Sequence, residues 1–528
     1  MRRLSVIVIG IMLVGSLFWL ASQLSDTPDA PPHSVGSLAT VPHETEDVSR
    51  DSSDVVPIWT KWPKPEAVLM ISGEQHGFFE PCGCTSSQMG GMARRADLLK
   101  RLNDVDWDVR GIDLGGLPRR TVRQAQIKFE TSLKALRDLR YVAVGLGPED
   151  LRLQPDFLLS QIDPDDASDE VRFVSANLVF YDSPELGIPV PSRIVEFGGR
   201  RVGITSVLSE STNAATFTEG TNTGITWSDP NAAIEKVLQD FEIQQVDFRI
   251  LLSHSSPNES RKLAADHPHF DVIVMAQGFS DPDPVAEPEQ VGDTLLLQVG
   301  HKGKYVGVLG LYSGEDEPSL RYQLVPLTRS EFADTPQMVD HMRDYQQWLQ
   351  YEQVAVQDGV IGHPTGASFT GAAKCGECHT DAMKIWEKTP HAHAFESLDP
   401  ANEREGYERL NGVPRIHDPE CLSCHVTGWN PQEYIRYRSG FLNKEFAQTE
   451  EDSALQVMLA GNQCENCHGP GSRHVELAEA DELDLARKEV KVSLEQAKAI
   501  CYGCHDTDNS PDFDFEQYWP EVSHYGMD

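Results

Sequence analysis

Apolar positions follow two alternating patterns between residues 65 and 330. Short apolar runs, typical of buried strands, alternate with longer segments in which apolar residues lie three or four apart, typical of amphipathic helices. The predicted strands are Val68–Ile71, Val109–Asp113, Tyr141–Val144, Val171–Ser175, Arg201–Thr205, Phe248–Ser253, Asp271–Met275, Thr294–Val299 and Val306–Leu311. The predicted helices are Met92–Leu102, Gln126–Leu139 and Asn231–Gln244. This alternation predicts an α/β domain over residues 63–330.

The pattern changes twice after this domain. Residues 331–365 form a predicted connector with one helix, Pro336–Val356, whose apolar face contains Met338, Met342, Tyr345, Trp348 and Leu349. From residue 366 to residue 528 regular patterning fades while cysteines and histidines become dense. A region so poor in aliphatic runs needs another source of core, and covalently held haems could supply it. The chain is therefore predicted to be multidomain.

The N-terminus has the pattern of an export segment. Met1–Arg3 is basic, and Leu4–Leu20 follows without a charged residue. Such a segment is either a membrane anchor, here of the inner membrane, or a signal peptide that is cleaved. Residues 1–22 are assigned to it, and the Ser-, Asp- and Pro-rich residues 23–62 are predicted to be a flexible tether. Both alternatives place the rest of the chain in the periplasm.

The charge balance narrows the class of partner. The 528 residues include 45 Lys+Arg and 82 Asp+Glu, a formal net charge of −37. A chain this acidic is repelled by phosphate backbones, so nucleic acid is excluded as the main partner. The expected partners are redox proteins of the periplasm, together with the membrane at the N-terminal segment.

Cysteine spacing carries the most specific chemistry. The motif Cys-x-x-Cys-His occurs four times, and its two thiols can form thioethers with one haem while the histidine binds the iron. The attachment cysteines are Cys375, Cys378, Cys421, Cys424, Cys464, Cys467, Cys501 and Cys504, and the proximal ligands are His379, His425, His468 and His505. Structural zinc is the alternative for paired cysteines, but it does not account for the histidine that ends every motif. Four c-type haems are the predicted cofactors.

The sixth position of each iron decides between electron transfer and catalysis. A second imidazole closes the iron, whereas an open face can bind a small molecule. The candidate distal ligands are His391, His393, His417, His474 and His524. Four closed irons need four such histidines, so the supply is sufficient.

The same region resembles a known family. Gly371–His379 (GAAKCGECH), with Trp386 and His391–Phe395 (HAHAF), looks like the opening of the tetrahaem cytochrome c-554 family. Gln463–His474 (QCENCHGPGSRH) and Ser510–Phe515 (SPDFDF), which follows the last motif, are similar to it as well.

This resemblance covers residues 366–528 and implies closely stacked haems on a mostly helical scaffold, with electron transfer as the activity. In the family most irons carry two histidines, and one haem can lack a distal protein ligand. Carried over by position, His391, His474 and His524 are the preferred distal ligands, and His417 is a further candidate.

The α/β domain resembles the metallophosphatase domain of the 5′-nucleotidase family. The segments that carry this resemblance are Ser72–Gly77, Met89–Arg95, Phe173–Asn177 and Leu252–His254. They imply an α/β sandwich with a metal site at the ends of its strands.

The catalytic residues of that family are largely missing. Its chemistry needs two metal ions about 4 Å apart, held by bridging carboxylate, His and Asn ligands. Asp113 is kept, but Glu74 replaces the first aspartate and Gly116 replaces the bridging carboxylate. The Gly-Asn-His-Glu and Gly-His-x-His motifs are replaced by Gly145–Glu149 and Ala276–Phe279. Hydrolysis of phosphoesters is therefore not expected.

A different site could occupy the same cleft. Cys82 and Cys84 are the two cysteines outside the haem motifs, and His76 and His254 would lie at the strand ends together with Asp113. Thiolates suit soft metals and redox exchange, which makes the cysteines a candidate redox pair and allows one metal ion in this domain. A structural disulfide is the alternative, since the compartment is oxidising.

The sequence thus predicts a periplasmic tetrahaem cytochrome that transfers electrons, fused to a non-hydrolytic phosphoesterase-like domain. The first alternative is a redox enzyme that acts on a small nitrogen or sulfur compound at an open haem or at Cys82 and Cys84. The second alternative is a metal-dependent phosphohydrolase.

Overall fold

The computed structural model describes residues 60–527, apart from gaps at 82–87, 164–169, 213–223, 277–280, 314–318, 358 and 403–409. Pro57–Asp528 forms one compact unit. The predicted export segment and the Cys82/Cys84 pair lie outside the described residues. Among the helices that are described, none is both long and apolar enough to cross a membrane.

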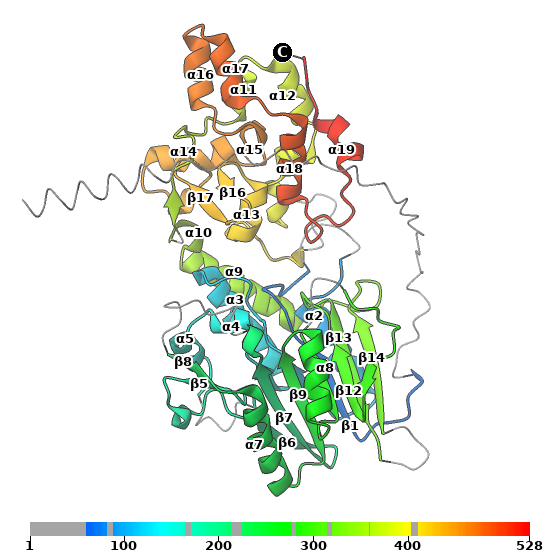
Figure 1. Cartoon of the computed structure of the whole chain (residues 1–528). Coiled ribbons are helices and arrows are strands. Elements are labelled where there is room, and N and C mark those ends of the chain that lie inside the picture. Colours follow the sequence, from blue (N-terminus) through cyan, green and yellow to red (C-terminus); the bar gives the residue numbers. More distant parts are fainter. Residues whose placement is uncertain are drawn as a thin grey trace, which may run out of the picture. The chain divides into compact units, whose positions relative to one another are not determined.

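Two six-stranded sheets form the first part of this unit (Figure 1). The first sheet has the order β14-β13-β1-β2-β3-β4, with β14 (Leu320–Pro326), β13 (Tyr305–Leu311), β1 (Ala67–Ser72), β2 (Val109–Asp113), β3 (Tyr141–Gly145) and β4 (Arg172–Val174). The second has the order β11-β12-β10-β9-β7-β6, with β11 (Glu289–Val291), β12 (Thr294–Gln298), β10 (Val272–Met275), β9 (Phe248–His254), β7 (Arg200–Leu208) and β6 (Arg193–Phe197). Their central strands run parallel. A small pair, β5 (Leu178–Phe180) and β8 (Ile225–Trp227), lies beside them.

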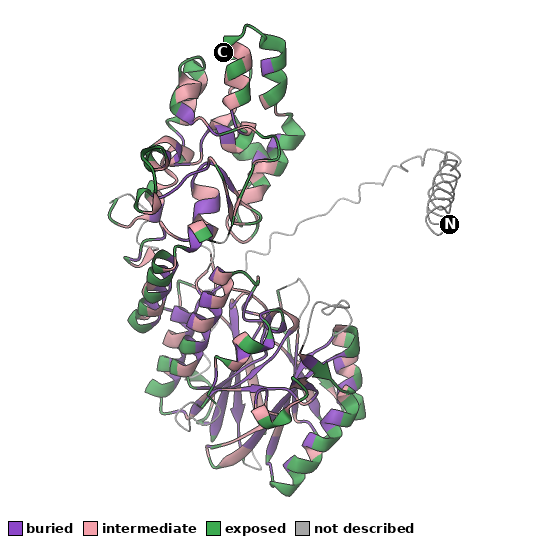
Figure 2. Ribbon diagram, turned by 90° about the vertical axis from the view of Figure 1, so that its left-hand side faces the viewer, coloured by how far each residue is buried: buried purple, intermediate pink, exposed green. Residues whose placement is uncertain are grey.

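Strand β1 shows why the two sheets stack. Successive side chains of a strand point to opposite faces, and every residue of β1 is buried. Val68 and Met70 join the core beneath the helices, whereas Leu69 and Ile71 join the core between the sheets. Both faces of this sheet are therefore covered, and buried strands fill the interior of Figure 2.

Helices cover the outer faces of both sheets. On the first sheet lie α2 (Met92–Asp104), α3 (Arg123–Asp138) and α9 (Pro336–Tyr351), and on the second lie α7 (Pro230–Ile243) and α8 (Pro257–Asp266). Short helices α4 (Pro148–Leu151), α5 (Pro155–Leu159) and α10 (Val354–Gln357) connect the larger elements. The result is an α/β sandwich of four layers.

The apolar patterns located most of this sandwich. All nine predicted strands and all four predicted helices are confirmed as elements, although α3 begins three residues earlier than predicted. Strands β5, β6, β8, β11 and β14 were missed because they are short or lie at sheet edges, where only part of each strand is buried. One face assignment was wrong, since the Trp348 side chain is 45% exposed while the other predicted residues of α9 are buried.

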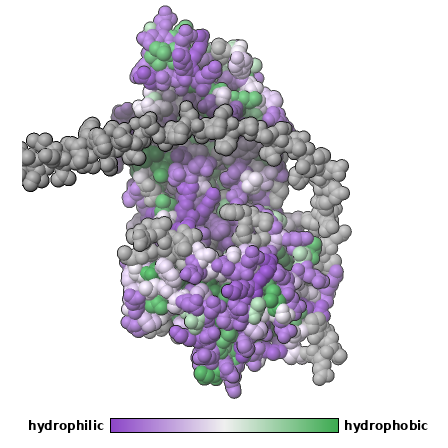
Figure 3. All heavy atoms as spheres, viewed as in Figure 1, coloured by the Kyte–Doolittle hydropathy of each residue, from purple (hydrophilic) through white to green (hydrophobic). Residues whose placement is uncertain are grey.

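The second part of the unit is mostly short helices around a small core. It comprises α11 (Ala372–Gly376), α12 (Thr380–Trp386), α13 (Pro419–His425), α14 (Glu450–Leu459), α15 (Cys464–His468), α16 (Ser472–Glu479), α17 (Leu483–Val490), α18 (Leu494–Cys504), α19 (Phe515–Val522) and a sheet of β15 (Val360–Ile361), β17 (Ile435–Tyr437) and β16 (Trp429–Asn430). Helices α12 and α16 bury none of their side chains, and the face seen in Figure 3 is largely hydrophilic. Such helices need a packing partner other than this small protein core.

Candidate haem sites and the degenerate phosphoesterase cleft

Each Cys-x-x-Cys-His motif lies on or directly after one turn of helix. The second, third and fourth motifs end α13, α15 and α18, and the first runs from α11 to the start of α12. Residues three apart on a helix lie on the same side, so both thiols of each motif can reach one ligand. All eight of these cysteines are free thiols, none of them in a disulfide.

Three of the four proximal histidines face a second imidazole. The ring centres are 6.1 Å apart for His379 and His474, 6.0 Å for His505 and His391, and 5.8 Å for His468 and His524. A metal–imidazole bond is about 2 Å long and the ring centre lies about 1 Å beyond the nitrogen, so two imidazoles on one metal ion have centres about 6 Å apart. The three pairs therefore have the spacing of two axial ligands of one iron.

The hydrogen bonds of these rings leave the correct nitrogen for iron. The Nδ1 atoms of His468 and His474 lie 2.8 and 2.9 Å from the carbonyl oxygens of Val490 and Ala486, both on α17. A ring that donates from Nδ1 to a carbonyl presents the lone pair of Nε2, which is how second-shell groups orient metal-binding histidines. The Nδ1 atoms of His425, His505 and His524 are bonded in the same way, to the Ala394 carbonyl, the Ser510 hydroxyl and the Val522 carbonyl.

The second motif is different. Within the part of the chain that is described, no imidazole ring lies in contact with that of His425. The candidate His417 instead places its Nε2 2.9 Å from the Glu445 carboxylate. His393 lies 3.3 Å from Glu396. Neither candidate is brought opposite a proximal histidine, and among the described residues His425 has no facing imidazole.

Neighbouring cysteines show how the four motifs are arranged. Cys375 of the first motif is hydrogen-bonded to Cys464 of the third, and Cys424 of the second is bonded to Cys504 of the fourth. Cys467 of the third motif lies close enough to Cys501 of the fourth to raise its pKa, after the larger effect of burial. The motifs therefore follow one another in space as first, third, fourth and second.

The carboxylate of Asp113, one of the residues predicted at the phosphoesterase-like site, interacts with other groups of the protein. It is fully buried and lies 4.0 Å from the guanidinium of Arg95, which is also fully buried. The Ser72 hydroxyl donates to its Oδ2 atom, and the Gly115 amide donates to Oδ1 at 2.8 Å. Burial raises the pKa of Asp113 in spite of these contacts. Each oxygen of this carboxylate therefore already accepts a hydrogen bond from the protein.

The two histidines of the cleft are likewise not arranged around a metal. The His254 ring donates from Nε2 to the Leu114 carbonyl at 2.5 Å. Burial, followed by the charges of His301, Lys302 and Arg119, lowers the pKa of His76 to about 4. In the described part of the chain, no three His, Cys, Asp or Glu side chains are grouped to hold a metal ion. His76, Asp113 and His254 therefore do not form the predicted cluster among these residues.

Residues 374–469 match the family model described as cytochrome c554 and c-prime. The C-terminal part of the chain is cytochrome c-554-like. Over 154 residues it is 31% identical to cytochrome c-554 of Nitrosomonas europaea. This match covers 26% of this chain and 58% of that protein. Over 216 residues the chain is also 27% identical to apyrase of Aedes aegypti, covering 36% of this chain and 37% of the relative.

Among solved structures, a 5′-nucleotidase precursor from Thermus thermophilus is similar at 19% identity and a TM-score of 0.46, covering 66% of this chain and 80% of that one. The chain thus spans 58% and 37% of the lengths of the two curated relatives. The predicted architecture, an N-terminal α/β sandwich followed by a mostly helical cytochrome-like region, is confirmed by the two six-stranded sheets and the short helices of the structure.

Polar side chains join the cytochrome c-554-like region to the sandwich. The Lys128 ammonium on α3 lies 2.5 Å from the Glu420 carboxylate on α13. Gln124 and Gln346 donate to the two oxygens of Asp418 at 2.7 and 2.8 Å. Asp418 also caps α13 by accepting from the Glu420 amide. The helix that carries the second motif is therefore fastened to α3 and α9, a role that residue patterns alone did not reveal.

Asp150 is a second residue that the sequence did not single out. Its carboxyl group accepts backbone N–H groups of Gly116, Leu117 and Gly147 at 2.6, 2.9 and 2.8 Å. It thereby ties together the two loops that carry the replaced metal motifs. Its position in the first turn of α4, two residues after a proline, is the signal that could have found it.

Asp150 predicts a pH dependence of stability. Burial raises its pKa to about 7, well above the value of about 4 in an unfolded chain. Between these values the folded state binds the proton that the unfolded state has released, so stability falls as the pH rises from 4 to 7. We expect thermal unfolding midpoints to fall from pH 5 to pH 8, and the fall to be smaller in Asp150→Asn. An equal fall in both proteins would contradict this assignment.

Proposed function

We propose that the protein is an exported tetrahaem c-type cytochrome that transfers electrons between periplasmic redox proteins. The observation that carries this proposal is the set of three imidazole pairs, each joining a motif histidine to a histidine distant in sequence at the spacing of two axial ligands. Haem iron bound there supplies reversible one-electron oxidation and reduction. The match to the cytochrome c-554 family supports covalent attachment.

Contacts between cysteines of different motifs support an order in which electrons would pass along the four haems. The thiol contacts place the first motif beside the third, the third beside the fourth and the fourth beside the second. Nδ1 hydrogen bonds orient the imidazoles of His425, His468, His474, His505 and His524, which limits the rearrangement needed when an electron arrives. The order first, third, fourth, second is therefore the proposed path, with the two ends available to different partners.

A second candidate function rests on the open face at His425. The ring of His425 is held by the Ala394 carbonyl at 2.7 Å, yet no described imidazole faces it. An open axial position permits a small nitrogen or sulfur compound to bind. The protein would then act as an oxidoreductase at its second haem, supplied with electrons by the other three.

Phosphoester hydrolysis is not part of the proposal. Two-metal chemistry requires carboxylate and imidazole ligands directed at one point, whereas Asp113 is bonded to Ser72 and Gly115, and His254 is bonded to Leu114. The sandwich instead holds α13 through Lys128 and Gln124. We propose that it is a scaffold for the second haem motif.

The haem content and spin states test both functions. We expect pyridine haemochrome quantification of protein purified from an exporting host to yield four haems per chain. Electron paramagnetic resonance of the oxidised protein should show three low-spin haems and one high-spin haem. Four low-spin haems would contradict the open site while leaving electron transfer in place, and fewer than four haems per chain would contradict the proposed path.

A further inference from the structure

A cavity lies between the sandwich and the helix of the second motif. It is a shallow recess that is partly open to solvent, and its enclosed space is no larger than a water molecule. The walls include Leu117, Phe129 and the first turn of α3, and Glu420 of α13 closes one side. Because Glu420 precedes Cys421, the cavity adjoins a haem attachment point. An anion could therefore bind only in the open part of the recess, against side chains at its rim.

Positive charge dominates this cavity. Arg119, Arg120 and Lys128 line it, and Glu420 is its one acidic residue. Three positive charges thus face one negative charge, in a chain whose net charge is −37. Lys128 and Glu420 neutralise each other at 2.5 Å. The two arginines supply the excess charge.

The contacts of both arginines are with neutral groups. Arg119 donates to the Tyr434 hydroxyl at 3.5 Å, and its guanidinium lies 6.0 Å from the centre of the Phe78 ring. Arg120 donates to the carbonyls of Gln432 and Glu433 and lies 3.9 Å from the centre of the Tyr434 ring. Within the described residues neither arginine takes part in an ion pair. Arg119 is exposed and Arg120 is partly exposed, so the charge of Arg120 is the less screened of the two.

We propose that this cavity binds an anionic oxygen group, either a small inorganic oxyanion or a carboxylate of a haem propionate, through Arg119 and Arg120. Guanidinium groups bind such oxygens with two parallel N–H donors, which suits a planar or tetrahedral oxyanion. The backbone carbonyls and the tyrosine ring keep the arginines in place without cancelling their charge. The site lies outside the replaced metal motifs and does not depend on them.

The test uses the full-length haem-loaded protein and sulfate, which does not bind haem iron strongly. Sulfate binding is measured by calorimetry at constant ionic strength, and the potentials of the haems are measured with and without sulfate. The variant is Arg119→Gln/Arg120→Gln. The control is Arg152→Gln, which removes an exposed arginine that does not line the cavity.

If the site takes a free oxyanion, sulfate binds saturably, and its affinity falls at least tenfold in the double variant and not in the control. If a propionate occupies it, sulfate has no effect, but the propionate bending band in resonance Raman spectra and one haem potential shift in the double variant alone. Either result supports the site. The proposal is overturned if sulfate does not bind and neither the Raman band nor any potential changes in the double variant.

Discussion

Replacing His474 with alanine is expected to convert the first haem from low spin to high spin. The imidazole of His474 lies opposite that of His379 with ring centres 6.1 Å apart, and alanine cannot bind iron. Electron paramagnetic resonance of the oxidised variant should therefore show two high-spin haems per chain, where one is expected for the unaltered protein. The haem content should stay at four, because the thioethers and the proximal histidine are unchanged.

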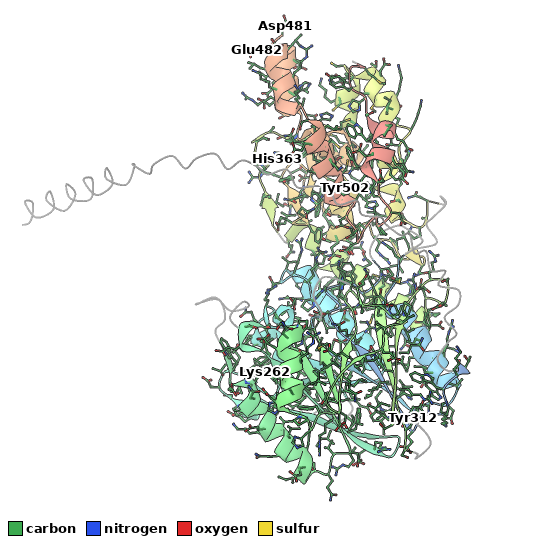
Figure 4. All side chains as sticks on the ribbon, turned by 45° about the vertical axis from the view of Figure 1, so that its right-hand side comes forward. Lys262, Tyr312, His363, Asp481, Glu482 and Tyr502 are labelled. Atoms are coloured by element: carbon green, nitrogen blue, oxygen red, sulfur yellow. The ribbon has the colours of Figure 1, made fainter. Side chains whose placement is uncertain are left out.

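Two features of His474 make this a sharp test. It is held by the Ala486 carbonyl within the α16–α17 hairpin, whose turn at Asp481 and Glu482 is labelled in Figure 4. Removing the ring deletes one ligand without breaking a core, since α16 buries none of its side chains. The matched control is His417→Ala, because His417 contacts Glu445 instead of a facing imidazole. If His417→Ala gains the high-spin signal, or if His474→Ala does not, the proposed pairing is wrong.

Replacing Arg95 with methionine is expected to lower the free energy of unfolding of the sandwich by about 3–5 kcal/mol. Arg95 is fully buried, donates to Ser72 and Gln75 at 3.1 and 2.8 Å, and lies beside the buried Asp113. Methionine fills a similar volume but leaves this carboxyl without a neighbouring positive charge. Chemical denaturation, followed by tryptophan fluorescence and by far-ultraviolet circular dichroism, measures the loss.

A second residue of α2, Lys100, provides the control for Arg95→Met. Lys100 and Asp104 form an ion pair on the exposed side of α2, where both side chains are more than half exposed. Exposed pairs of this kind contribute about 0.5 kcal/mol, so Lys100→Met should change stability little. A loss in Arg95→Met no larger than in Lys100→Met would show that Arg95 does not stabilise Asp113. Stabilisation of the unaltered protein by Mn²⁺ or Zn²⁺ would show that Asp113 still serves a metal.

The secondary structure of the sandwich could be predicted from the sequence in more detail than that of the cytochrome c-554-like region. Strand β2 was located to the residue because four of its five residues are buried, and the apolar Val109 and Ile112 mark it although Arg110 and Asp113 are charged. The edge strands β6 and β14 were missed because half-buried residues carry a mixed pattern. In the cytochrome c-554-like region no apolar pattern was available, so short motifs with covalent meaning carried the prediction instead.

The candidate haem sites also include residues that the sequence could assign and residues that it could not. Haem attachment could be read from the sequence because the two cysteines and the histidine of each motif are local, and one helical turn sets their geometry. The distal histidines are not local: His379 pairs with His474, and His391 with His505, across long stretches of chain. Sequence could nominate these residues, but it could not show which imidazoles face each other or that His417 lies beside Glu445.

By itself, the sequence determined the sandwich, the four Cys-x-x-Cys-His motifs and the replacement of the metal motifs, since each depends on residue identity at short spacing. Only the tertiary structure decided which imidazoles face each other, that His425 lacks such a partner among the described residues, and that Asp113 is bonded to protein groups. It also placed Lys128 against Glu420 and left Arg119 and Arg120 facing a cavity. The reason is physical: short-range geometry follows from backbone dihedral angles, whereas contacts between distant residues depend on how whole elements pack.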